Sequence, residues 1–139
     1  MRLLSADGEN EMSDKENVLI VDDEETIRRL LANRLASEGY HCLEAGSANS
    51  ALEELDAGVV ALVLLDIKMP GKSGVQLLPE IRNGYPDTVV IMATAITDTA
   101  TAVHCMRQGA YDYVTKPFNL PEVVLSVERA LEKRRLELE

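Results

Sequence analysis

Four short apolar runs of this chain each stop at polar side chains. The runs cover residues 18–21, 62–65, 89–93 and 111–115. The polar residues that end them are Asp22 with Asp23, Asp66, Thr94 and Lys116. Such runs are typical of buried parallel strands, whose carboxyl ends form the ligand-binding edge of an open α/β sheet. The pattern therefore predicts that three carboxylates, a hydroxyl and an ammonium lie together at one edge.

Segments of helical period alternate with these runs along the chain. Strands are predicted at 18–22, 40–45, 61–66, 88–93 and 111–115. Helices are predicted at 24–38, 47–57, 74–84, 98–108 and 119–136. Strands that alternate with helices at this spacing imply right-handed crossovers and a parallel sheet covered on both faces. Periodicity alone leaves the strand order open.

Local signals mark the ends of several predicted helices. Ser73 with Gln76, and Asn119 with Glu122, have the spacing of a capping side chain and its partner three residues later. Glycines near four predicted helix ends are expected to adopt the left-handed conformation that often closes a helix. These glycines are Gly39, Gly58, Gly84 and Gly109.

Composition indicates one globular domain. The chain has 139 residues, 46% of them hydrophobic, and no apolar stretch near the roughly 20 residues that cross a bilayer. Residues 1–16 are polar and predicted to be disordered, without a secretory signal, so a cytoplasmic location and no membrane partner are expected. Cys42 and Cys105 match no metal-binding spacing and are interpreted as reduced thiols. The net charge of −10 argues against direct nucleic-acid binding.

Four sequence motifs resemble the response-regulator receiver domains of two-component signalling. They are VLIVDDEE at 18–25, LLDIKMPGKSG at 64–74, MATA at 92–95 and YVTKPF at 113–118. The resemblance covers residues 17–131, the predicted receiver domain. It implies a flavodoxin-like (βα)5 fold, doubly wound, with a five-stranded parallel sheet in the order 2-1-3-4-5. The acidic residues would then lie at the topological switch point.

The charges themselves argue for a bound cation. Two unit charges about 4 Å apart repel by roughly 4 kcal/mol at an effective dielectric near 20, so three crowded aspartates need positive partners. Lys116 supplies one positive charge. The oxygen-rich ligand set, which contains no thiolate, suits a hard divalent ion, Mg²⁺ or Mn²⁺. A carboxylate beside such an ion can act as a nucleophile toward phosphorus.

The resemblance assigns a role to each acidic residue. Asp66 resembles the phosphoacceptor, and Asp22 and Asp23 resemble the acidic metal-binding pair. The backbone carbonyl of Lys68 would be a further metal ligand. Without the family resemblance, the residue pattern also allows a structural explanation, in which Asp22 and Asp23 cap a helix and Asp66 belongs to a turn.

The resemblance also implies a conformational switch. Thr94 would bond a phosphoryl oxygen, Lys116 would pair with the phosphoryl group, and Tyr113 would follow the movement of Thr94. The bond between Lys116 and Pro117 is expected to be cis. A strand threonine and a core aromatic residue are the simpler interpretations of Thr94 and Tyr113.

The implied function is a phosphoacceptor switch rather than a turnover enzyme. A partner histidine kinase, a phosphotransfer protein or a small phosphodonor would supply the phosphoryl group. The response would alter the surface of the fourth helix, fifth strand and fifth helix, a surface compatible with a homodimer. Lys68 and Ile96 offer no group to orient a water, so slow self-dephosphorylation is expected. The alternative is a pseudo-receiver that binds partners without phosphorylation.

The last residues of the chain leave their role open. Residues 132–139 are predicted either to extend the last helix as a solvated tail or to start a linker to an effector domain or output protein. The kind of output is not readable from them.

Overall fold

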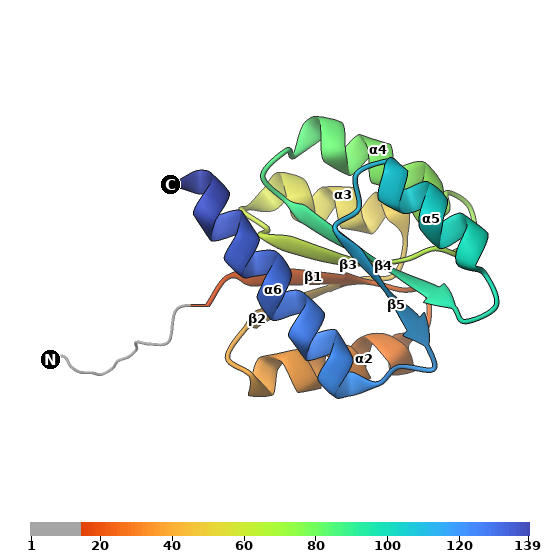
Figure 1. Cartoon of the computed structure of the whole chain (residues 1–139), viewed down its shortest axis with the longest axis horizontal. Helices are drawn as coiled ribbons and strands as arrows, with labels where there is room; N and C mark the ends of the chain where they lie inside the picture. Colours follow the sequence, from red (N-terminus) through yellow and green to blue (C-terminus); the bar gives the residue numbers. More distant parts are fainter. Residues whose placement is uncertain (1–14) are drawn as a thin grey trace, which may run out of the picture.

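Five parallel strands form a single sheet in the computed structural model, which describes residues 15–139. The strands are β1 (Asn17–Val21), β2 (His41–Ala45), β3 (Leu62–Asp66), β4 (Val89–Ala95) and β5 (Asp112–Lys116). Their order is β2-β1-β3-β4-β5 (Figure 1). This confirms the flavodoxin-like fold and the strand order that the family resemblance implied. Of the segment predicted to be disordered, residues 1–14 lie outside the described residues.

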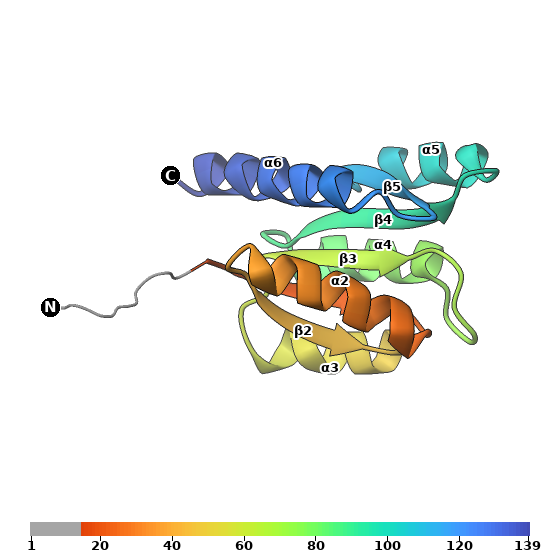
Figure 2. The ribbon, with the colours of Figure 1, turned by 90° about the horizontal axis from the view of Figure 1, so that it is seen from below.

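Five helices cover the two faces of the sheet. They are α2 (Glu25–Ser37), α3 (Ala48–Ala57), α4 (Gly74–Gly84), α5 (Thr99–Arg107) and α6 (Leu120–Leu138). All five predicted helices are confirmed, with bounds shifted by at most two residues. Helices α2 and α6 lie on one face, and α3, α4 and α5 lie on the other (Figures 1 and 2). Among residues 15–139 there is no helix with the length and apolar character needed to cross a membrane.

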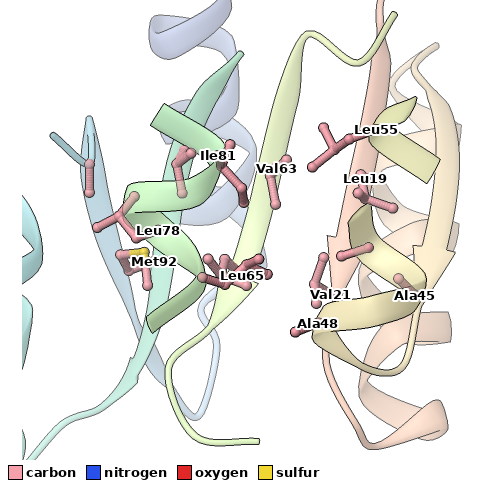
Figure 3. Close-up of a cluster of buried hydrophobic side chains, with 14 of the residues drawn as sticks. Leu19, Val21, Ala45, Ala48, Leu55, Val63, Leu65, Leu78, Ile81 and Met92 are labelled. Atoms are coloured by element: carbon pink, nitrogen blue, oxygen red, sulfur yellow. The ribbon is translucent and has the colours of Figure 1, made fainter. Parts of the chain in front are cut away.

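Two hydrophobic clusters hold the helices on the sheet. Alternate residues of each central strand point to opposite faces, so Leu19 and Val63 pack toward α3 and α4, while Ile20 and Leu64 pack toward α2 and α6. Figure 3 shows the first cluster, in which Leu65 lies among side chains of the neighbouring strands and α4. Strand β3 is buried along its whole length, as expected for the centre of a parallel sheet.

Strand register brings the polar strand ends together. Asp66 at the end of β3 is aligned with Ala93 of β4, next to Thr94. Thr94 is aligned with Thr115, and Ala95 with Lys116 at the end of β5. The carboxyl edge of the sheet therefore presents the residues that the sequence pattern singled out.

The predicted helix starts are confirmed by their hydrogen bonds. The Ser73 hydroxyl accepts from the backbone N–H of Gln76 at 3.2 Å, and the Gln76 side chain accepts from the N–H of Ser73 at 2.9 Å. This reciprocal pair fixes the start of α4, immediately after the loop that leaves Asp66. Asn119 likewise accepts from the N–H of Glu122 at 3.2 Å at the start of α6.

The glycine prediction is correct at two of four helix ends. Gly39 and Gly109 have φ of 100° and 107°, in the left-handed region. The prediction is wrong for Gly58, which is extended with φ of −175°, and for Gly84, which is the last residue of α4. At α4 the closing contact comes from Tyr85, whose N–H donates to the Ile81 carbonyl, so no left-handed residue is needed there.

The last turns of α6 are tied to the body of the domain. Arg134 Nε donates to the Asp87 carbonyl at 2.7 Å. Arg135 donates two hydrogen bonds of 2.7 and 2.8 Å to the Glu16 carboxylate, just before β1. The helix ends at the opposite end of the sheet from the polar strand ends (Figure 1).

Candidate functional site

A buried ion pair forms the centre of the polar edge. Lys116 Nζ lies 3.0 Å from Asp22 Oδ2 and 3.2 Å from Asp66 Oδ1. The side chains of Asp22 and Asp66 are only 3% and 7% exposed. One ammonium therefore bridges two carboxylates that are almost excluded from water.

Asp23 adds a third carboxylate to those of Asp22 and Asp66. It is exposed, and carboxylate oxygens of Asp22, Asp23 and Asp66 all lie within 4.8 Å of one another. A cavity of about 240 Å³ is lined by Asp23 and Asp66 together with Thr94, Lys116 and Lys68. Three negative charges share one nearby ammonium, so the donor set fits a hard divalent cation coordinated by oxygen.

The alternative explanation for Asp22 and Asp23 is not supported. The residue that precedes α2 is Glu24, and its side chain makes no capping hydrogen bond. The Asp22 carboxylate instead accepts from the N–H of Glu24 itself at 2.9 Å. This bond holds one oxygen of Asp22 while the other faces Lys116. Asp22 thus faces Lys116 and Asp23 lines the cavity, so neither carboxylate caps the helix.

The pKa of the Asp66 carboxyl is raised by its surroundings. Burial raises it first, and the negative charge of Asp22 raises it further, while the attraction and hydrogen bond of Lys116 act in the opposite direction. For Lys116, burial lowers the pKa, but the hydrogen bond to Asp22 and the attraction of Asp66 outweigh burial and raise it. The contact with Lys116 therefore does not fully offset the burial of Asp66 and the negative charge of Asp22.

Thr94 lies beside the cavity with its hydroxyl turned to the following loop. Its side chain is buried, and its Oγ1 lies 3.3 Å from the Ala95 carbonyl and 3.4 Å from the Asp98 carbonyl. Asp98, which sequence reasoning missed, lines the same cavity and caps α5 through the Thr101 N–H at 3.4 Å. The position of Asp98 directly before a helix was the only signal that marked it.

Tyr113 lies outside the acidic cavity. It is half-buried against the hydrophobic cluster on the α5 side of the sheet, two residues before the partner of Thr94 in β5. Its backbone N–H donates to the Asp112 carboxylate at 2.8 Å, and Ser126 of α6 donates to the same carboxylate at 2.7 Å. Asp112 therefore links β5 to α6 next to this tyrosine.

The loops beside the site add two further contacts. The backbone N–H of Lys68 lies 3.4 Å from Asp66 Oδ1, and the Lys68 side chain is exposed. The bond between Lys116 and Pro117 is cis, the geometry that the family resemblance implies.

Gly74 is a residue of the site that sequence reasoning missed. A Cβ atom at this position would lie 2.1 Å from the Asp66 carbonyl oxygen, which is far closer than atoms pack. The N–H of Gly74 donates to the Ile67 carbonyl at 2.9 Å. The start of α4 thus packs directly on the backbone that carries Asp66. A glycine placed directly after the capping Ser73 was the available signal.

Comparison with known proteins agrees with this geometry. The family described as response regulator receiver domain matches residues 18–128. The chain is 40% identical over 122 residues to the regulatory protein AtoC of Escherichia coli (strain K12), covering 88% of this chain and 26% of AtoC. It is 41% identical over 125 residues to the nitrogen assimilation regulatory protein NtrX of Azorhizobium caulinodans, covering 88% of this chain and 28% of NtrX. The chain spans about a quarter of the length of these relatives.

Solved structures give the same assignment. The receiver domain of NtrX from Brucella abortus is 41% identical, with a TM-score of 0.80, and the match covers 83% of this chain and 98% of that one. The beryllofluoride-activated NtrC4 receiver domain dimer is 35% identical, with a TM-score of 0.80, and the match covers 85% and 98%. The chain therefore belongs to the response regulator receiver domains, the phosphoacceptor signalling switches of two-component systems.

Proposed function

We propose that Asp66 is the phosphoacceptor of this receiver domain. The supporting observation is that a buried Asp66 carboxylate lines a cavity, contacts Lys116 at 3.2 Å and lies within 4.8 Å of carboxylate oxygens of Asp22 and Asp23. An Asp66 oxygen forms the new bond to phosphorus as the bond to the donor breaks, and the electron pair leaves with the donor. A phosphohistidine donor leaves as imidazole, which takes up a proton. Lys116 balances charge on the transferring oxygens.

Asp22, Asp23 and Asp66, with the backbone carbonyl of Lys68, would hold Mg²⁺ or Mn²⁺. When bound, the ion supplies positive charge to the phosphoryl oxygens during transfer. The raised pKa of Asp66, caused first by burial and then by the charge of Asp22, supports this part of the proposal, because a bound cation would stabilise the ionised carboxylate. Asp22 is oriented by its bond to the Glu24 N–H before any ion binds.

Phosphorylation would act on the rest of the domain through Thr94. Its hydroxyl is held by loop carbonyls at 3.3 and 3.4 Å, and a phosphoryl oxygen is a stronger acceptor that would draw it toward Asp66. That movement would open space toward Tyr113 and change the surface formed by α5, β5 and α6. Moving the ratio of the two conformations from 1:99 to 99:1 takes about 5.5 kcal/mol. A smaller shift in these populations needs less free energy and would give a graded output.

The aspartyl phosphate is proposed to be long-lived. Lys68 and Ile96 flank the site two residues after Asp66 and Thr94, and Ile96 is 64% exposed. Neither side chain has a carboxylate or amide that would orient an attacking water. We therefore expect slow self-dephosphorylation, and a phosphoryl lifetime of only seconds would contradict this.

The partners follow from the same proposal. The phosphoryl group would come from a histidine kinase or phosphotransfer protein, and the receiver would control an effector domain or output protein. Relatives include proteins named DNA-binding transcriptional regulator NtrC, so we propose that the output controlled by this domain binds DNA. A related receiver domain is described as a dimer, so we also propose a homodimer through α5, β5 and α6. The cytoplasmic location and the lack of direct nucleic-acid binding by this domain stay predictions.

Intact mass separates this function from a pseudo-receiver. The protein is incubated with acetyl phosphate and Mg²⁺, with parallel samples in EDTA and with the Asp66→Asn variant. We expect the mass of one phosphoryl group on the wild-type chain with Mg²⁺ and an unmodified mass in both controls. An unmodified wild-type chain would refute the proposal and support a binding module that uses this fold without phosphorylation.

A further inference from the structure

Arg28 of α2 is joined to the acidic pair through the peptide backbone. Its Nη1 donates to the Asp22 carbonyl oxygen at 2.7 Å, the shortest of the contacts made by this side chain. That carbonyl belongs to the peptide unit between Asp22 and Asp23. A rotation of this unit would change the direction in which both carboxylate side chains leave the backbone.

Two further observations show that the guanidinium has a fixed place. Arg28 Nε lies 3.2 Å from Glu44 of β2, and the two side chains are only 17% and 27% exposed. Gly46, just after β2, leaves room for the guanidinium, because a Cβ atom there would lie 3.1 Å from Nη1. The planar group is thus held between a carboxylate and a carbonyl, with a glycine beside it.

We propose that Arg28 is a positioning residue that orders the Asp22–Asp23 peptide for divalent-cation binding. This inference rests on the proposed function of the acidic site. The Asp22 carboxylate is already tied to the Glu24 N–H at 2.9 Å, so the guanidinium constrains the same turn from its other side. An ordered turn binds the ion without first losing backbone freedom. Arg28 itself does not touch the ion or the phosphoryl group.

Neighbouring Arg29 provides a matched control. It also pairs with Glu44, at 3.1 Å, but its side chain is 62% exposed. Arg29 Nη2 pairs with Glu25 at 3.3 Å, so both of these ion-pair partners lie outside the Asp22–Asp23 turn. Removal of either arginine changes the net charge equally, whereas only removal of Arg28 frees the Asp22 carbonyl.

The test compares Arg28→Gln with Arg29→Gln by calorimetric titration of the unphosphorylated proteins with Mg²⁺ and with Mn²⁺. We expect Arg28→Gln to weaken ion binding about tenfold, the lower end for residues that orient metal ligands, and Arg29→Gln to stay within twofold of wild type. Faster amide exchange at Glu24 in EDTA is expected for Arg28→Gln alone. Phosphorylation of this variant by acetyl phosphate should approach the wild-type rate once Mg²⁺ is saturating.

Equal weakening by both substitutions would overturn the proposal, because net charge would then be the cause. Unchanged ion binding in Arg28→Gln would overturn it as well. If that variant does not fold, Gly46→Ala, which presses on Nη1, should also weaken ion binding, and unchanged binding there would refute the inference. A wild-type chain that binds Mg²⁺ but takes up no phosphoryl group would refute the proposed function, while the ion-binding comparison would still decide the role of Arg28.

Discussion

The Asp66→Asn substitution should stabilise the metal-free protein, although it removes the proposed phosphoacceptor. Two unit charges 4.8 Å apart, the outer limit for these carboxylate oxygens, repel by about 3.5 kcal/mol at an effective dielectric near 20. Asp22 and Asp23 are both such neighbours of Asp66, so their combined repulsion is about 7 kcal/mol. The attraction of Lys116 at 3.2 Å offsets about 5 kcal/mol of this repulsion. The balance predicts a gain of about 2 kcal/mol in unfolding free energy, to which relief of carboxylate burial contributes in the same direction.

The gain should depend on pH with a definite sign. Because the pKa of Asp66 is raised in the folded protein, the folded state binds the proton more tightly than the unfolded chain does. The cost of the charge is complete above the folded-state pKa and disappears as the pH falls toward the ordinary value of 3.8. Wild-type and variant stabilities should therefore differ most near neutral pH and converge in acid.

Urea denaturation in EDTA measures this difference, and thermal unfolding should show a rise of roughly 6–8 °C for a chain of this length. Mg²⁺ at ten times its dissociation constant should stabilise the wild type by about 1.4 kcal/mol and the variant by less. Exposed Asp23 offers a comparison, because Asp23→Asn removes the same kind of repulsion but relieves no burial, so it should stabilise the metal-free protein by less than Asp66→Asn does. An Asp66→Asn protein no more stable than wild type in EDTA would refute the charge reasoning.

Three further substitutions test other parts of the structure. Gly74→Ala should cost about 2–3 kcal/mol in urea denaturation, because its Cβ would press on the Asp66 carbonyl, and an unchanged midpoint would contradict that close packing. Lys116→Met should lower the free energy of unfolding by about 2–3 kcal/mol at pH 7 in EDTA. Because the pKa of Lys116 is raised above its ordinary value of 10.5, this difference should shrink as the pH rises past 10.5, and a constant difference up to pH 11 would argue against the ion pair. Ser126→Ala should cost about 1–2 kcal/mol by leaving Asp112 without its α6 donor, and Ser126→Thr, which keeps the hydroxyl, should recover part of this.

The element pattern was readable from the sequence because buried strands and amphipathic helices differ in length and period. The apolar runs at β1 and β3 were bounded by charges, and the caps at Ser73 and Asn119 marked helix starts without ambiguity. Strand order was a different matter. Side-chain periodicity carries no information about which strands pair, so the order came from family resemblance. The error at Gly84 has a local cause, since the Tyr85 amide closes α4 without a left-handed residue.

The acidic part of the site was equally predictable. Asp22, Asp66 and Lys116 stand at strand ends, and parallel strands deliver their ends to one edge. Arg28 gave no such signal, because an arginine on the first helix has the sequence appearance of an ordinary exposed charge. Its contact with the Asp22 carbonyl depends on where α2 crosses β2, which is a property of tertiary packing.

The anchored end of α6 sets a mechanical limit on signalling. With 19 residues the helix is about 28 Å long, so a tilt of about 5° around its start beside β5 would displace Leu138 by about 2.5 Å. At Arg134 and Arg135, about 22 Å from the start of the helix, the same tilt moves the backbone by about 2 Å, which would lengthen their hydrogen bonds to Asp87 and Glu16 beyond bonding distance if the side chains kept their conformations. A rotation of α6 of this size thus requires these three hydrogen bonds to break or the arginine side chains to rearrange, whereas displacements well below an ångström leave the bonds intact. Arg134 and Arg135 therefore oppose large changes in the direction of α6.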